Sequence, residues 1–135
     1  SPPINVPVTF MDNLNIGVFQ QAVYLRGRAL RRVLSVEEIL GYSAELGGVM
    51  TKAVFMWDPL RDVHIFRGLN NSYILEEKIA PLLGYADPRK IYDDLFLRAK
   101  IIRKMIEHNI FRYRDVVKII VDFQKYGLEK LPFTV

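Results

Sequence analysis

The segment from Val54 to Phe66 constrains the fold of this chain more than any other part of the sequence. Two runs rich in β-branched and aromatic residues flank a turn-forming stretch, Asp58-Pro59-Leu60-Arg61-Asp62. Proline at the second turn position presets φ near about −65°, and the carboxylate of Asp58 can accept a hydrogen bond within the turn. The pattern therefore predicts a β-hairpin, with the chain's single tryptophan, Trp57, at its edge.

A second hairpin is predicted before this one. Residues 16–25 are rich in valine, phenylalanine and tyrosine, and Gly27 can take the positive φ of a tight turn. Residues 29–39 then return antiparallel, and because neither face of that strand is purely polar, we expect contacts on both of its sides. The glycines and Glu45 within residues 41–48 predict a loop between the two hairpins.

Beyond Asn70 the apolar pattern changes to the helical period of about 3.6 residues. Asn71 or Ser72 can cap a first helix at its start. Gly84 can end that helix in the left-handed conformation, and Pro81 predicts a kink or an early stop just before it.

Two more helices are predicted toward the end of the chain. Asp87 and Pro88 open the second one, as a cap followed by a first-turn proline. Its expected apolar stripe consists of Ile91, Leu95, Ile102 and Ile106. Asn109 can end it, and a third helix over residues 113–126 stops at Gly127.

Together these elements predict an α+β fold of two consecutive antiparallel β-hairpins followed by a three-helix C-terminal subdomain. A chain of 135 residues fits one domain. Its expected parts are a lead with a short helix (1–15), the hairpins (16–67) and the helices (70–127).

Composition narrows the class of protein. Half of the residues are hydrophobic and 25% are charged, as in a globular protein. The apolar runs are far shorter than the roughly 20 residues that span a bilayer. Pro2, Pro3 and Pro7 stand where a signal peptide would be apolar. The absence of cysteine excludes disulfides and thiolate metal ligands, and we expect a cytoplasmic protein.

Carboxylates and histidines form no convincing catalytic pattern. Asp93-Asp94 and Glu76-Glu77 are paired carboxylates that could hold a metal ion or share a proton, but each pair falls on a predicted helix and is better explained as solvated charge. His64 and His108 lie in different elements without a second ligand at helical spacing. We therefore assign no catalytic, cofactor or metal site to this chain.

An arginine cluster is the most interesting polar feature. Its members are Arg26, Arg28, Arg31 and Arg32. Guanidinium groups bind carboxylates and phosphates through paired hydrogen bonds, and arginines at a strand turn can reach a neighbouring subunit. The four residues are therefore our candidate subunit interface. The alternative is a structural arginine ladder that faces solvent.

A basic segment over residues 98–114 suggests a different function. Its arginines and lysines alternate with apolar residues, so a helix there could present a basic face to a protein or a nucleic acid. Phe111 and Tyr113 fall at a turn rather than on a stacking platform, which argues against nucleic acid. Core packing with a solvated basic edge explains the same pattern.

The order of these motifs resembles a known family. The hairpin around Trp57, with residues 31–41 before it and residues 71–79 after it, resembles the C-terminal end of the type II/IV secretion ATPases. The archaeal members, which include the archaellum motor, are the most similar. The Pro2-to-Pro7 stretch resembles the segment that follows the last catalytic motif of that family. The resemblance covers about residues 2–125.

This resemblance implies the C-terminal part of a RecA-like ATPase domain whose full chain forms a hexameric ring. The ring would couple ATP hydrolysis to protein export or filament assembly, with a membrane platform protein as partner, at the cytoplasmic side of the membrane. ATP and Mg²⁺ would belong to the full-length parent, because this sequence has no Gly-x-x-x-x-Gly-Lys-Ser/Thr loop. The alternative is a free-standing basic binding module for protein or nucleic acid.

Overall fold

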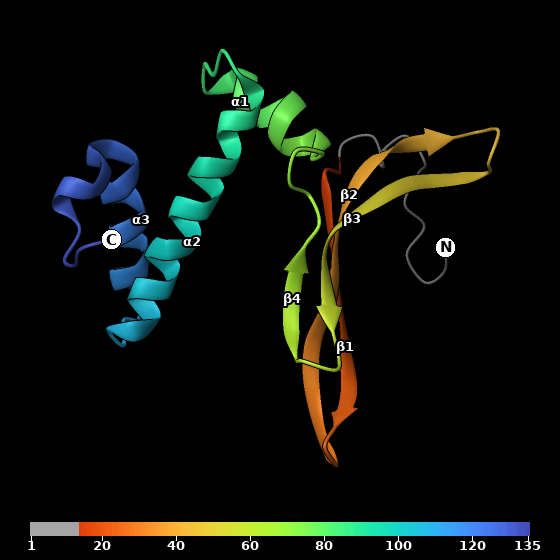
Figure 1. Cartoon of the computed structure of the whole chain (residues 1–135), viewed down its shortest axis with the longest axis horizontal. Helices are drawn as coiled ribbons and strands as arrows, with labels where there is room; N and C mark the ends of the chain where they lie inside the picture. The colour runs from red at the N-terminus through yellow and green to blue at the C-terminus, as the bar shows by residue number, and fades with distance from the viewer. Residues whose placement is uncertain (1–13) are drawn as a thin grey trace. The chain divides into compact units, whose positions relative to one another are not determined.

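The structure, a computed structural model, describes residues 14–135 and has the predicted α+β composition (Figure 1). Four strands precede three helices in the order expected from the sequence. The chain forms two compact units, one that ends at Ile91 and one over Tyr92–Val135, and each is described by itself. The expected lead and short helix fall almost entirely on residues 1–13, outside the described residues.

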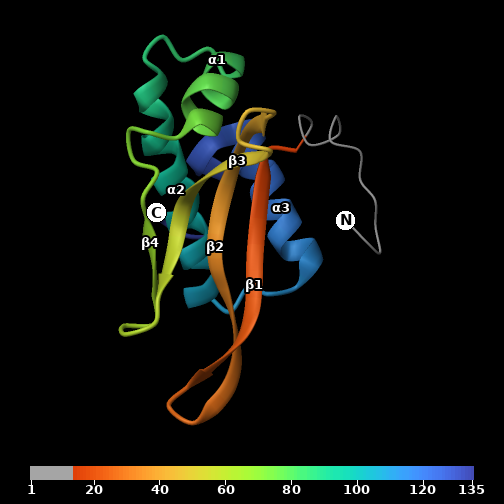
Figure 2. The same ribbon diagram turned by 90° about the vertical axis from the view of Figure 1, so that its right-hand side faces the viewer.

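The strands form one antiparallel sheet in the order β1-β2-β3-β4 (Figure 2). Their bounds are Ile16–Leu25 for β1, Arg28–Ser43 for β2, Gly48–Asp58 for β3 and Val63–Phe66 for β4. The two predicted hairpins are therefore joined, because β2 also pairs with β3. This leaves β1 and β4 at the edges of the sheet.

The turn between β1 and β2 is as tight as the sequence predicts. Leu25 pairs with Arg28, so only Arg26 and Gly27 connect the strands. Both have positive φ, 51° and 75°, which is the type I′ geometry that suits the twist of a hairpin.

The predicted loop over residues 41–48 is too long, because both strands continue into it. β2 extends to Ser43 and β3 begins at Gly48, which leaves a four-residue turn. Gly41 has φ 137°, a value that side chains rarely permit, and the register shifts between Ile39 and Gly41. Glycine thus produces a β-bulge within a continuous strand instead of ending it.

β1 and β2 extend beyond the rest of the sheet as a two-stranded arm (Figure 2). Pairing between β2 and β3 ends at the Ser35–Met56 pair, whereas pairing between β1 and β2 continues to the Leu25–Arg28 pair. Among the described strands, only β1 pairs with residues 28–34 of β2. We call residues 20–34 the basic arm.

The first helical segment belongs to the same unit as the sheet. It starts as a π-helical stretch, Ile74–Ile79, and continues as the short α1, Ala80–Leu82. Gly84 follows with φ 78°, as predicted for its end. Pro81, which lacks an N–H, lies in the first turn of α1, and the segment continues past it to Leu82 instead of stopping early.

The second unit packs two helices with the C-terminal tail. The single turn Pro88–Lys90 leads into α2, Ile91–Glu107, and α3 is Tyr113–Tyr126. Asp87 caps this start through a hydrogen bond from the Arg89 N–H, as predicted. A further turn, Gly127–Lys130, leads to the tail, which packs against the core through Leu131, Phe133 and Val135.

The predicted stripe on α2 is wrong in its second half. Ile102 and Ile106 are 52% and 57% exposed, whereas Ile101 and Met105 are buried. Together with Ile119 of α3, these two form the core on which the tail packs. The exposed pair, Ile102 and Ile106, and the buried pair, Ile101 and Met105, are adjacent on the helix, and the position of α3 decides which pair is buried.

Candidate interaction surfaces

Arg32 is part of a polar network that ties the basic arm to the β3–β4 turn. Its Nε and Nη2 donate to the two carboxylate oxygens of Asp62, each at 2.8 Å. The indole N–H of Trp57 donates to Asp62 Oδ1, also at 2.8 Å. A bidentate pair is among the more specific ion-pair geometries. Arg32 therefore has a structural role. Among the described residues, it is the member of the four predicted interface arginines whose guanidinium group forms an ion pair within the fold.

The electrostatics of Asp62 follow from these bonds. The donors Arg32 and Trp57 hold the pKa of the Asp62 carboxyl well below its usual range, and Arg26 adds a longer-range attraction. In the same turn Arg61 donates to Asp58 at 2.7 Å and lowers the pKa of that carboxyl. Both acidic side chains of the turn are thus already paired.

His64 supports the junction of the arm with the sheet. Its Nε2 lies 2.8 Å from the carbonyl oxygen of Val33. Val33 lies just beyond the last β2–β3 pair, so this carbonyl has lost its strand partner. The histidine satisfies a backbone group, which explains its position without any catalytic role.

Glu38 is a buried carboxylate that the sequence analysis did not single out. Only 3% of it is exposed, in the middle of β2. One oxygen accepts from the N–H groups of Tyr73 and Ile74, at 2.8 and 3.3 Å, and the other accepts from the hydroxyl of Ser72. The Ser72 Oγ in turn accepts from the Leu75 N–H at 3.0 Å, as the predicted cap does.

This arrangement fixes the first helix to the sheet. A carboxylate is favourable at a helix N-terminus, where backbone N–H groups lack partners within the helix. The signals in the sequence were one of two adjacent glutamates in β2 and the Asn71-Ser72 cap. Their pairing across 34 residues cannot be read from periodicity. The role of Glu38 is structural.

The three remaining arginines do not form one cluster. Arg28 shares a face with Leu30 and Val23, whereas Arg31 lies on the opposite face beside Ala22. Arg26 occupies the turn. All three are exposed, and within residues 14–135 their side chains have no hydrogen-bond or ion-pair partner. The end of the basic arm is thus positively charged on both faces of the hairpin, and the three arginines do not form a single patch.

The outer edge of β1 is a second exposed surface. Ile16, Val18 and Phe19 are each more than half exposed, at 52%, 61% and 51%, and Tyr24 reaches 83%. As an edge strand, β1 also presents backbone groups without a neighbouring strand among the described residues. Such an edge can take an added strand.

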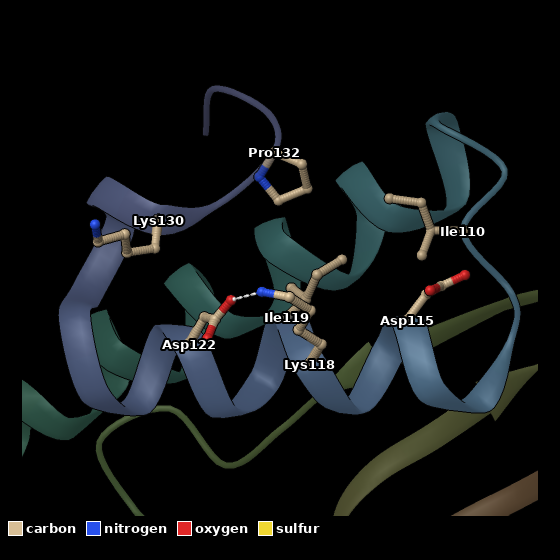
Figure 3. Close-up of a pocket in the computed structure, with 7 residues that line it drawn as sticks. All are labelled: Ile110, Asp115, Lys118, Ile119, Asp122, Lys130 and Pro132. Carbon is tan, nitrogen blue, oxygen red and sulfur yellow. Dashed lines mark hydrogen bonds and ion pairs between the residues drawn. The ribbon is translucent and has the colours of Figure 1, made fainter.

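The helical unit contains a small pocket of about 260 Å³ (Figure 3). It is lined by Ile110, Asp115, Lys118, Ile119, Asp122, Lys130 and Pro132. Lys118 and Asp122 form an ion pair at 2.7 Å, which raises the pKa of the lysine. The volume is below the usual range of roughly 300–1,000 Å³ for ligand sites. We assign no ligand to it.

The basic segment over residues 98–114 is partly neutralised by its own helix. Arg98 pairs with Asp94 at 2.9 Å and lies over the ring of Phe123, and Lys104 pairs with Glu107 at 3.4 Å. These contacts weaken the case for a free-standing basic binding module.

Two structural findings concern residues 14–135. No group of three or more histidine, aspartate or glutamate side chains is arranged to hold a metal ion there. None of the helices in that range is long and apolar enough to cross a membrane.

The geometry defines an α+β protein with an open β-meander, a basic arm and a helical unit, and the comparisons extend this description. No protein-family model matches the chain. The chain is 59% identical over 133 residues to uncharacterized protein MJ0900 of Methanocaldococcus jannaschii, across 98% of this chain and 24% of that protein.

Two further proteins of M. jannaschii, uncharacterized proteins MJ1287 and MJ0781, are 29% and 26% identical to this chain over 124 residues. These matches cover 92% of the chain but 44% and 17% of the two proteins. The chain thus spans less than half of each relative, and the matched segment occurs in proteins of different lengths.

Proposed function

We propose that this chain is the C-terminal, non-hydrolytic part of a secretion or archaellum-assembly ATPase, and that β1 is the strand through which it joins the rest of the RecA-like sheet. The observation that carries the proposal is the open edge of β1 with its exposed apolar side chains Ile16, Val18 and Phe19. The proposal also draws on the resemblance of the Trp57 hairpin and its flanking segments to that family.

A strand added beside β1 has two favourable consequences. It pairs the backbone groups along the edge, and it removes apolar surface from water at about 25 cal/mol per Å². Long apolar edges promote aggregation and are normally covered or blunted. A neighbouring strand from the parent domain provides the cover that an edge of this composition requires.

The residues of this chain indicate which part of the proposed ATPase binds the nucleotide. Holding ATP phosphates requires a backbone cradle and a lysine that this sequence lacks, so ATP and Mg²⁺ are bound by the rest of the parent. The presence of the segment in relatives of three different lengths supports a part that works within larger proteins. In this proposal its partners are the other subunits of a hexameric ring and a membrane platform protein, and it lies in the cytoplasm at the membrane.

A graft tests this function. Residues 1–135 replace the matching segment of the relative with 59% identity, and Mg²⁺-dependent phosphate release from ATP is measured. We expect the graft to hydrolyse ATP at a rate close to that of the parent relative, and the isolated chain to give only background. Absence of hydrolysis by the unmodified relative would overturn the proposal, and so would binding of Mg-ATP by the isolated chain.

A further inference from the structure

We propose that the basic arm binds a short acidic segment of a partner protein, added as a strand along the free edge of β2 between Arg28 and Arg32. This surface is on the opposite side of the arm from the β1 edge discussed above. The inference rests on the arm alone and does not depend on the ATPase assignment.

The free edge exists because β3 ends before the arm does. β2 has no β3 partner before Ser35. In a two-residue hairpin the closing pair, here Leu25 and Arg28, is hydrogen bonded, and alternate residues then direct their backbone groups away from the partner strand. Ala29, Arg31 and Val33 are therefore the residues whose backbone groups face the free edge.

Two hydrogen bonds agree with this alternation. The carbonyl of Val33 is bonded to His64, and the carbonyl of Arg31 accepts from the Arg32 guanidinium at 2.9 Å. Both acceptors therefore face away from β1. What remains for a partner strand is the N–H and C=O of Ala29 and the N–H groups of Arg31 and Val33. This short row suits a segment of a few residues.

Charge selects the chemistry of the partner. From Leu14 to Val36 the sequence contains four arginines and no aspartate, glutamate or lysine. The two acidic groups of the nearby β3–β4 turn are bonded within the fold, Asp62 to Arg32 and Asp58 to Arg61. Among the described residues, three exposed guanidinium groups on the arm thus remain for the carboxylates of a partner.

The arrangement favours a protein strand over a nucleic acid or a lipid surface. A strand directs its side chains alternately to both faces, so one segment can reach Arg28 on one face and Arg31 on the other. A phosphate backbone or a membrane surface approaches from one side and meets only part of this charge. Tyrosine, arginine and aliphatic side chains together are also typical of the centre of a protein interface.

The binding test uses a fluorescent peptide that alternates glutamate and threonine, with fluorescence anisotropy as the readout at low salt. The double variant Arg28→Glu, Arg31→Glu is expected to raise the dissociation constant by at least about tenfold, since two attractive contacts become repulsive. The matched control is Arg67→Glu, Arg89→Glu, which makes the same charge change at two exposed arginines of the same unit. The control should bind like the parent.

A second variant separates strand addition from simple charge attraction. Ala29→Pro removes an N–H that faces the free edge, leaves the β1–β2 hydrogen bonds intact and keeps every arginine. We expect it to weaken peptide binding about threefold or more while far-UV circular dichroism stays unchanged. Unchanged affinity for the acidic peptide would overturn the strand geometry.

Three competitors complete the experiment: a lysine–threonine peptide, a short DNA duplex, and phosphatidylcholine vesicles that contain phosphatidylserine. We expect none of them to displace the acidic peptide at equal concentration. No binding of the acidic peptide, equal loss in the control double variant, or tighter binding of the duplex or the vesicles would each contradict it.

Discussion

Glu38 joins two elements that are distant in sequence, because its carboxylate, in the middle of β2, receives the donors at the start of the first helix. Glu38→Ala leaves the hydroxyl of Ser72 and the N–H of Tyr73 without this acceptor in a buried site. We expect the free energy of unfolding to fall by about 3 kcal/mol, the upper end for orphaned buried donors. Urea denaturation measures the change.

The neighbouring residue supplies the control. Glu37 accepts from the hydroxyls of Ser35 and Thr51 at a more exposed position, at 3.1 and 2.9 Å. Glu37→Ala should therefore cost less than about 1 kcal/mol. Equal losses for the two variants would mean that Glu38 does not anchor the helix.

Asp62 makes stability depend on pH. Because its pKa is lower in the folded chain, through the bonds from Arg32 and Trp57, the unfolded chain binds the proton more readily. The stabilisation is therefore fully present above the unfolded pKa of about 3.9, and it is lost as the pH falls below that value. Asp62→Asn should lower the thermal midpoint at pH 7, and the difference from the parent should shrink toward pH 2.

Asparagine is a suitable replacement at position 62. Asp62 has φ 51°, a left-handed conformation that asparagine also tolerates. Glu45→Gln, at an exposed position of the β2–β3 turn, is the control and should leave the pH profile unchanged. A constant gap between the Asp62→Asn variant and the parent from pH 7 to pH 2 would contradict the role of the ion pair.

Among the candidate residues, the sequence predicted the exposed arginines but not how they divide. Arg26, Arg28 and Arg31 point to solvent, whereas Arg32 binds Asp62, thirty residues away in sequence. Strand alternation alone already places Arg31 on the opposite face of β2 from Arg28 and Arg32. The arrangement of the second hairpin beside the first decides which arginine forms an ion pair with Asp62. Sequence periodicity does not predict that arrangement.

At the scale of the elements, the edge of β1 makes a prediction about association. By the alternation that starts at the Leu25–Arg28 pair, Ala22 directs its N–H outward and Gln21 directs its N–H toward β2. If the chain associates through this edge, Ala22→Pro should weaken association without unfolding the hairpin. Sedimentation velocity over a wide concentration range measures the shift toward monomer.

Gln21→Pro is the informative contrast, because it removes a bond within the hairpin rather than one at its outer edge. It should destabilise the sheet, with a lower thermal midpoint, while Ala22→Pro stays close to the parent. A parent chain that remains monomeric at every concentration would show that the β1 edge is not available for association between copies.

Cap and turn residues predicted where helices and strands start and end better than the apolar pattern predicted which face of a helix is buried. The Asp87-Pro88 start, the Asn109 turn and the Gly127 stop all lie where turn and cap chemistry put them, with positive φ at Asn109 and Gly127. Gly41 was misread because glycine serves a bulge as well as a loop. The α2 stripe was misread because two apolar rows lie side by side on that helix, and only packing against α3 distinguishes them.

At the scale of the whole molecule, the first helical segment groups with the sheet, while α2 and α3 form the other unit. The hydrogen bonds that Glu38 accepts explain why the first helix stays with the sheet despite its position among the helices in the sequence. Sequence periodicity does not predict such long-range bonds, because it describes each segment separately. The described part of the chain has three exposed features that could bind other proteins. They are the β1 edge, the basic arm and the pair Ile102 and Ile106.

We propose that this chain completes a ring ATPase through the edge of β1. The most direct test is the native mass, in the presence of Mg-ATP, of the relative that carries this chain in place of its own segment. We predict a six-subunit assembly when the graft carries this chain without substitutions, and smaller species when the graft carries Ala22→Pro. A hexamer of unchanged stability in both proteins would contradict the role of β1, and a single subunit with the parent sequence would contradict the ring.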